Sequence, residues 1–150
     1  MAAAQRKIMF LCTGNYYRSR FAELVFNAKA QAAGLDWVAD SRGLRLDQGP
    51  NGNVGPISEF TIAGLKQRQI PLPAEWRSPR QVSREELAGH DLVIALKEAE
   101  HRSMLESRHP EWAGRVEYWH VHDLDQASAD QALAEIETLI DGLITRLAAR

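Results

Sequence analysis

Two residues near the start of the chain could do chemistry together: a cysteine and an arginine six positions after it, Cys12 and Arg18. A cysteine thiolate is a nucleophile, and the planar fork of an arginine can hold two oxygens of a phosphate group. The next residue, Ser19, could donate a hydrogen bond to the thiolate or cap a helix. The spacing of these three residues therefore predicts a site where a thiolate faces a phosphate group.

The segment lies between an apolar run and a helical pattern, which together must position it. Residues 8–11 are apolar, as in a buried parallel strand. Apolar side chains then recur at helical spacing over 19–33, before a natural helix stop at Gly34. At the carboxyl end of such a strand, loop N–H groups and the helix N-terminus can converge on an anion. The expected phosphate-binding residues are Thr13, Gly14, Asn15, Tyr16, Tyr17 and Ser19.

The alternative is that Cys12 is an ordinary buried cysteine and Arg18 a surface charge. That interpretation would be preferred for a lone cysteine, but the placement of Cys-x5-Arg-Ser between a strand and a helix favours a site. The loop also lacks the glycine pattern of a dinucleotide site and the lysine of a nucleotide-binding loop.

The rest of the chain alternates predicted strands and helices. This alternation predicts an α/β fold, with an open parallel sheet of about four strands and helices on both faces, in one domain over 1–150. The polar stretch 42–55 is long for a loop, which favours a functional role in tuning the choice of substrate. The further strands are expected at 37–41, 91–96 and 116–121, and the further helices at 56–67, after Ser83, at 97–106 and from Ser128 to about Leu147.

Composition limits the classes of partner. The net charge of -2 gives no basic field for nucleic acid, and no apolar stretch is long enough for a membrane helix or a signal peptide. We therefore expect a cytoplasmic protein with no nucleic-acid or membrane partner, its oligomeric state left open. The single cysteine excludes an internal disulfide, and only His120 and His122 have a spacing that metal ligands could use.

The segment around Cys12 resembles the signature of a known family. Phe10-Leu11-Cys12-Thr13-Gly14-Asn15, followed by Arg18-Ser19 and Ala22-Glu23, is similar to that of the low-molecular-weight protein tyrosine phosphatases, whose fold arsenate reductases share. The resemblance extends, less specifically, to Asp40-Ser41-Arg42-Gly43, to 91–96 and to 118–123.

The resemblance implies a mechanism and a fold. Cys12 would attack phosphorus to form a phosphocysteine, while Arg18 and the loop amides stabilise the phosphate oxygens and Asn15 braces the loop. An aspartic acid would protonate the leaving oxygen. Asp123 is the expected general acid, with Asp125 as the alternative. The family needs no metal or cofactor, and its substrates are phosphorylated proteins or small phosphomonoesters.

The chain departs from the family pattern in the phosphate loop, at the general acid and at Lys97. A family member commonly has Cys-Arg-Ser-Pro where this chain has Tyr17-Arg18-Ser19-Arg20, so the second, protective cysteine is missing. No Asp-Pro follows Trp119, and Lys97 stands where an aspartate is common.

Tyr17 could form an aromatic wall for a phosphotyrosine ring or pack against a neighbouring helix. The arginines expected to be solvated are Arg77, Arg80, Arg84, Arg102, Arg108 and Arg115.

Three other functions stay open at the level of sequence. An arsenate reductase would have to use an external thiol, because this chain has only Cys12. A phosphoarginine phosphatase is disfavoured by Tyr16, since the resemblance associates that specificity with threonine at this position. A non-catalytic, phosphate-binding regulatory module is favoured by the missing Asp-Pro but does not explain the thiol.

Overall fold

Four parallel strands form the centre of the molecule, in the order β2-β1-β3-β4. The structure is a computed structural model that describes residues 5–48, 53, 55–121 and 128–149. The strands are β1 (Arg6–Cys12), β2 (Trp37–Gly43), β3 (Leu92–Ala95) and β4 (Glu117–Tyr118). The predicted parallel α/β fold is confirmed.

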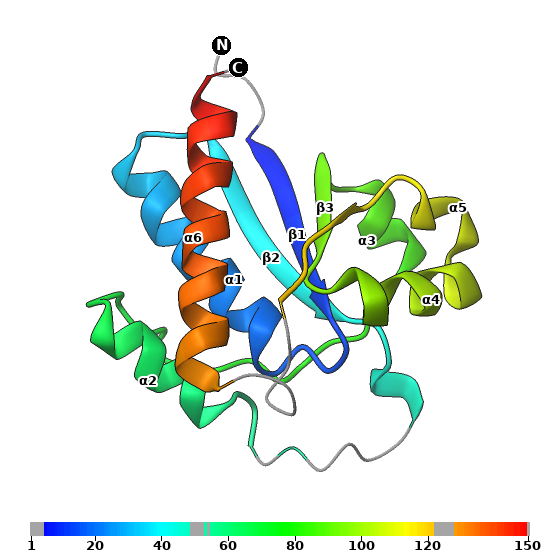
Figure 1. The fold of residues 1–150 in the computed structure, drawn as a ribbon, viewed down its shortest axis with the longest axis horizontal. Helices are drawn as coiled ribbons and strands as arrows, with labels where there is room; N and C mark the ends of the chain where they lie inside the picture. Colours follow the sequence, from blue (N-terminus) through cyan, green and yellow to red (C-terminus); the bar gives the residue numbers. More distant parts are fainter. Residues whose placement is uncertain (1–4, 49–52, 54, 122–127, 150) are drawn as a thin grey trace.

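Helices cover both faces of the sheet, and side chains of β1 alternate between them (Figure 1). Ile8 and Phe10 belong to the larger core, and Met9 and Leu11 to the core on the opposite face. The larger core packs against α1 (Arg18–Ala32), α2 (Glu59–Gln67) and α6 (Ala129–Ala148). The other face is covered by α3 (Arg84–Ala88), α4 (Glu98–Arg108) and α5 (Pro110–Ala113).

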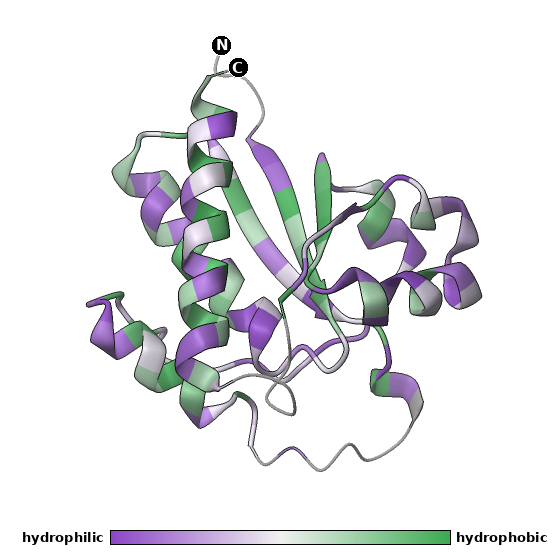
Figure 2. Cartoon of the chain, viewed as in Figure 1, coloured by the Kyte–Doolittle hydropathy of each residue, from purple (hydrophilic) through white to green (hydrophobic). Residues whose placement is uncertain are grey.

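The last helix shows how the sequence pattern selects a face. Along α6, apolar residues alternate with polar ones in Figure 2, and its buried residues include Leu133, Ile136 and Ile140. Their spacing of three or four places them on one stripe, which packs on α1 and the sheet. No helix within the described ranges is long and apolar enough to cross a membrane.

The helix ends that were predicted from a capping serine or from a stop glycine are confirmed. Ser83 forms the capping box that its sequence predicts, with Glu86. Ser128, which was expected to cap the last helix, also forms a capping box, with Gln131. Gly34, which follows the C-cap Ala33 of α1, has φ of 69°, a left-handed conformation that favours glycine.

Several predicted boundaries are wrong. The helix expected from Pro56 begins at Glu59, because Ser58 is the N-cap and its side chain accepts a hydrogen bond from the Phe60 N–H. The second strand continues through Arg42 and Gly43, since both pair with β1. The stretch 46–48 is a 3-10 helix, α5 was not expected, and β4 is shorter than predicted.

The strand order places a crevice at one end of the sheet. The chain moves from β1 to β2 on one side and returns to β3 on the other side of β1. In open parallel sheets, ligands bind at such a reversal, beyond the carboxyl ends of the strands. Cys12 is the last residue of β1, and so it lies at this crevice.

Candidate active site

The predicted phosphate loop surrounds a small pocket at the end of β1. The pocket has a volume of about 180 Å³. Its lining consists of Cys12, Thr13, Gly14, Tyr16, Tyr17, Arg18, Asn53 and Ser58. The structure therefore brings together most of the predicted site residues, while Asn15 and Ser19 are buried behind the pocket lining. The two candidate acids, Asp123 and Asp125, lie outside the described residues.

The thiol of Cys12 is in hydrogen-bond contact with Ser19. The two side chains are 2.9 Å apart, between Sγ and Oγ. The Ser19 hydroxyl also accepts a hydrogen bond from Nδ2 of Asn15, at 2.9 Å. Because its oxygen is the acceptor in that bond, Ser19 can direct its own hydrogen to the sulfur. The arrangement is suited to stabilising a thiolate.

Asn15 holds the loop in an unusual conformation. Its φ is 49°, in the left-handed region that few residues other than glycine adopt. The fully buried side-chain amide donates to Ser19 and to Ser41, the latter at 2.9 Å. Its oxygen accepts from Nη1 of Arg77 at 2.9 Å and from the backbone N–H of Arg80 at 3.1 Å. Every polar group of this amide is thus paired, which offsets the cost of the backbone conformation.

Arg77 was expected to be solvated, and that expectation is wrong. Its side chain is 25% exposed and reaches from the connector after α2 to the loop. In addition to Asn15, its Nη2 donates to the Ser41 carbonyl at 2.9 Å and to the Ser41 hydroxyl at 3.1 Å. Glu23 and Asp40 each lie 3.4 Å from the same nitrogen. Arg77 is therefore part of the support of the loop.

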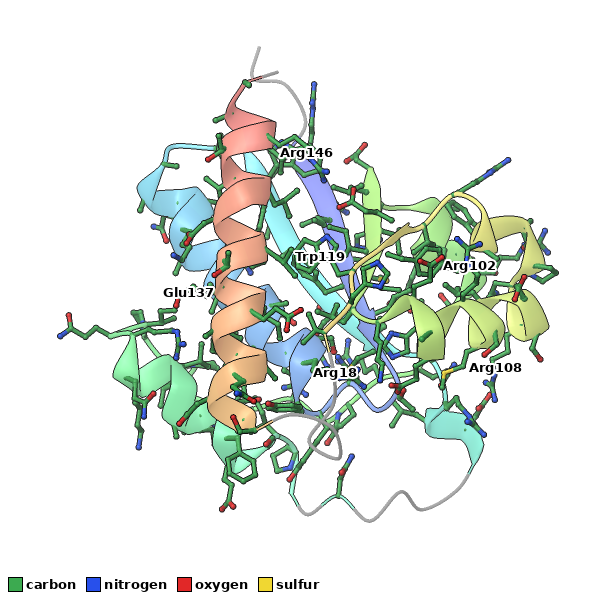
Figure 3. The ribbon with its side chains drawn as sticks, viewed as in Figure 1. Arg18, Arg102, Arg108, Trp119, Glu137 and Arg146 are labelled. Carbon is green, nitrogen blue, oxygen red and sulfur yellow. The ribbon has the colours of Figure 1, made fainter. Side chains whose placement is uncertain are left out.

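The other arginines that were expected to be solvated differ in their exposure and in their contacts. Arg84 is solvated as expected, with its side chain 74% exposed. Arg108 instead makes a two-point contact with the carboxylate of Asp47, at 2.6 and 2.7 Å. Arg102 lies over the ring of Tyr118, 4.4 Å from its centroid (Figure 3 labels both arginines).

Arg20 occupies the position of the family's proline and is almost fully buried, with 3% exposed. It donates to three carbonyls, those of Asn15 at 3.3 Å, Pro56 at 3.2 Å and Arg77 at 2.8 Å. Burial and the neighbouring Arg77 cation lower the pKa of Arg20 to about 10, so the side chain is charged at neutral pH. A buried positive charge therefore lies behind the loop, where it favours an anion in the pocket.

Ser41 is anchored by a buried carboxyl group. Its hydroxyl donates to Oε1 of Glu23 at 2.6 Å. Burial raises the pKa of Glu23, while the bond from Ser41 and the charge of Arg77 act in the opposite direction. This contact fixes the orientation of the Ser41 hydroxyl, so that its oxygen accepts from Asn15.

The two tyrosines of the loop have different surroundings. Tyr17 is 5% exposed, belongs to the larger core, and its hydroxyl lies 3.4 Å from the Ala129 carbonyl at the start of α6. Tyr16 is half-buried, and its carbonyl accepts from the Ser58 N–H at 3.0 Å. Both line the pocket. Tyr17 therefore packs against a neighbouring helix and also forms part of the wall, the two possibilities left open by the sequence.

Arg18 is held at the start of α1, near the carboxyl ends of the strands (Figure 3). Its Nη1 donates to the Val121 carbonyl at 3.2 Å, and its Nη2 lies 3.1 Å from Oε1 of Glu100. The sequence interpretation did not include Glu100. The feature of the sequence that could have pointed to Glu100 is its position in the first turn of a helix that follows a strand of the same sheet.

The structure offers no assembled metal centre within the described residues, where no group of three or more His, Cys, Asp or Glu side chains could hold an ion. His120, half of the spaced histidine pair, is exposed and lies 3.9 Å from Glu98. His122 falls outside the described residues.

The site has a thiol beneath a loop that joins the first strand of a parallel sheet to a helix, and an arginine at the start of that helix. These features define a class of protein, the α/β proteins with a cysteine-containing phosphate loop. Within that class, residues 7–150 match the low molecular weight phosphotyrosine protein phosphatase family. The chain belongs to this family. No curated protein matches it by sequence.

The chain is also similar to solved structures. The low molecular weight protein tyrosine phosphatase of T. tengcongensis is 30% identical, with a TM-score of 0.77 over 94% of this chain and 99% of that one. YwlE, an arginine phosphatase solved as a Cys-to-Ser mutant with a phosphorylated active-site serine, is 27% identical, with a TM-score of 0.75 over 95% of each chain. YfkJ from Bacillus subtilis, at 24% identity, shares the fold, with a TM-score of 0.82 over 98% and 97%.

Proposed function

We propose that the protein is a protein tyrosine phosphatase that hydrolyses phosphomonoesters through a phosphocysteine on Cys12. The observation that carries the proposal is the 2.9 Å contact between Cys12 Sγ and Ser19 Oγ, in a pocket that Arg18 also lines. A site for binding phosphate alone would not need a thiol at this position, since a thiolate repels the anion that it faces. The same thiolate is required for attack on phosphorus.

The proposed reaction has two steps. First, the Cys12 thiolate forms an S–P bond as the P–O bond to the leaving group breaks, and an aspartic acid gives its proton to the leaving oxygen. Then the same carboxylate takes a proton from water, the water oxygen attacks phosphorus, and the S–P bond breaks to release phosphate. Asp123 is the proposed acid and Asp125 the alternative. Arg18 and the loop N–H groups stabilise the transferring phosphoryl group in both steps.

The wall of the pocket supports an aromatic substrate. Tyr16 and Tyr17 line it, and an aromatic ring packs well against another in an offset or edge-on arrangement. Because a solved relative is an arginine phosphatase, phosphoarginine is the substrate to compare with phosphotyrosine. The family resemblance associates phosphoarginine specificity with threonine at the position of Tyr16, and so we expect phosphotyrosine to be preferred.

The proposed setting follows from the chemistry of the thiol. A nucleophilic cysteine must stay reduced, and the cytoplasm keeps thiols reduced. We therefore propose that the protein acts in the cytoplasm on phosphorylated proteins or small phosphomonoesters, with 1–150 acting as one catalytic domain.

The test is hydrolysis of p-nitrophenyl phosphate without added metal, by the wild type and by Cys12→Ser, Asp123→Asn and Asp125→Asn. We expect Cys12→Ser to be inactive. The Asp variant that loses more activity on phosphotyrosine than on p-nitrophenyl phosphate, which has a better leaving group, carries the general acid. A reduced wild type that binds phosphate but hydrolyses neither ester would favour the binding module. Reduction of arsenate with an external thiol, without ester hydrolysis, would favour the reductase.

A further inference from the structure

The segments that follow β1 and β3 meet at the end of the sheet. The two strands are parallel neighbours, with Leu11 paired to Ala95, so the phosphate loop and the first turn of α4 leave the sheet side by side (Figure 1). Lys97 is the N-cap of α4. The topology therefore brings the start of α4 against the loop that carries Cys12.

Glu100, in the first turn of α4, joins the two ends of the loop. Its Oε1 lies 3.1 Å from Nη2 of Arg18, and its Oε2 lies 3.5 Å from Nη1. The hydroxyl of Thr13 donates to Oε1 of the same carboxylate. Arg18 is 2% exposed and the Glu100 side chain 26%. One carboxylate thus contacts the residue after the thiol and the arginine at the start of α1.

A buried histidine fixes this carboxylate. Nδ1 of His101 accepts a hydrogen bond from the backbone N–H of Lys97 at 3.1 Å, which places the hydrogen of a neutral ring on Nε2. Nε2 lies 3.2 Å from Oγ1 of Thr13 and 3.5 Å from Oε1 of Glu100. The hydrogen bond from His101, followed by those from Thr13 and Arg18, holds the pKa of Glu100 well below its usual range. The group is therefore an anion at neutral pH.

We infer that Glu100 is a positioning residue for Arg18, which it holds in the orientation that the transferring phosphoryl group requires. The inference rests on the proposed function of the site. It also accounts for Lys97: the carboxylate that the sequence resemblance leads one to expect at 97 comes from Glu100, one helical turn further along. A guanidinium has five N–H groups, so the contact with Glu100 is compatible with a two-point contact to phosphate.

The charge of Glu100 predicts an asymmetric effect on catalysis. A carboxylate this close to Arg18 partly offsets the positive charge that attracts a phosphate dianion. It therefore weakens ground-state binding, while it keeps Arg18 aligned for the charge that develops in the transition state. Removing the carboxylate should lower kcat without raising KM. A residue that only supports the fold would not produce this separation.

The kinetic test compares Glu100→Gln with Glu98→Gln, a matched loss of charge from the same helical turn. With p-nitrophenyl phosphate we expect kcat of Glu100→Gln to fall about 10-fold to 100-fold, with KM equal to or below that of the wild type. We expect Glu98→Gln to match the wild type. A rise in KM at unchanged kcat would overturn the inference, as would equal losses in both variants.

A double-mutant cycle ties the effect to Arg18. In an Arg18→Lys background the Glu100→Gln change should have little further effect on kcat, because the fork that Glu100 orients is gone. If Glu100→Gln lowers kcat by the same factor with and without Arg18, the carboxylate acts on something else and the inference is wrong. Thermal unfolding of each variant, together with Glu100→Asp, which keeps the charge, identifies any variant that fails to fold.

A binding measurement separates this inference from the proposed function. Vanadate can adopt the trigonal geometry of the transition state, and inorganic phosphate represents the ground state. By calorimetry, Glu100→Gln should bind vanadate about 10-fold or more weakly and phosphate no more weakly. That result supports the inference even if the wild type hydrolyses no ester, in which case the proposed function alone fails. Unchanged vanadate affinity would overturn the inference even in an active phosphatase.

Discussion

The side-chain oxygen of Asn15 lies 2.9 Å from a terminal nitrogen of Arg77, which is 62 positions away along the chain. Asn15 has a left-handed backbone conformation in the middle of the phosphate loop. Because Arg77 also contacts both oxygens of Ser41, it links the loop to the end of β2. The shape of the loop thus depends on a cation from a distant connector.

Replacing Arg77 tests this dependence. Arg77→Ala leaves the buried oxygen of Asn15 with one donor fewer, and such a loss costs about 1–3 kcal/mol. We expect a fall of that size in the free energy of unfolding and a loss in kcat of about 10-fold. The control is Arg80→Ala, because Arg80 bonds Asn15 through its backbone N–H. Urea unfolding and steady-state kinetics check both, and equal behaviour of the two variants would contradict the assignment.

Ser19 should control the reactivity of the thiol. The Ser19 hydroxyl lies 2.9 Å from Cys12 Sγ, where it can donate a hydrogen bond to the sulfur. We therefore expect Ser19→Ala to react with iodoacetate at neutral pH about 10-fold more slowly than the wild type. Ser103→Ala is the control, because Ser103 is an exposed residue of α4. Alkylation of Cys12 can be followed by mass spectrometry. An unchanged rate would show that Ser19 does not stabilise the thiolate.

Glu100 should make stability depend on pH in the acid range. The pKa of Glu100 is lowered in the folded chain, first by the hydrogen bond from His101 and then by Thr13 and Arg18. The folded chain therefore binds fewer protons than the unfolded chain at mildly acid pH. The stability that this provides is fully present above the usual value of 4.5 and is lost as the pH falls through the lower folded value.

The measurement is urea unfolding of the wild type and Glu100→Gln at neutral pH and at about pH 3. The wild type should lose more stability than the variant between the two conditions, since glutamine does not titrate. Parallel losses would show that Glu100 has an ordinary pKa.

Oxidation of Cys12 should be hard to reverse. It is the only cysteine of the chain, so no second thiol can convert a sulfenic acid to a protective disulfide. We expect peroxide to inactivate the enzyme and dithiothreitol to restore little activity after long exposure. Phosphate present during exposure should protect, because the pocket leads to Cys12. Full recovery with dithiothreitol would contradict the prediction.

Local patterns were sufficient for the fold and for the central motif. The strand that ends at Cys12 and the helix that begins at Arg18 depend on periodicity and on residues within a few positions of one another. The same is true of the capping box at Ser128, whose partner Gln131 is three residues away. Such signals can be read from sequence because the chain itself holds the partners together.

The supporting residues could not be predicted in this way. Arg77, Arg20 and Glu100 reach the phosphate loop from a connector, from a buried helix face and from a neighbouring strand's helix. None belongs to a periodic pattern that singles it out, and an isolated charged residue is usually solvated. The prediction that a helix begins at Pro56 was wrong for a related reason. Proline suits a first helical turn, but the N-cap at Ser58 determines where α2 begins.

The central claim is that Cys12 carries the phosphoryl group during turnover. The most direct measurement mixes the reduced wild type with a phosphotyrosine peptide, denatures it within milliseconds at alkaline pH, and locates phosphate by mass spectrometry. We predict phosphate on Cys12 in the wild type and none at position 12 in Cys12→Ala, because alanine offers no nucleophile there. Steady hydrolysis of the peptide with no phosphate ever found on Cys12, or with phosphate on another residue, would contradict the account.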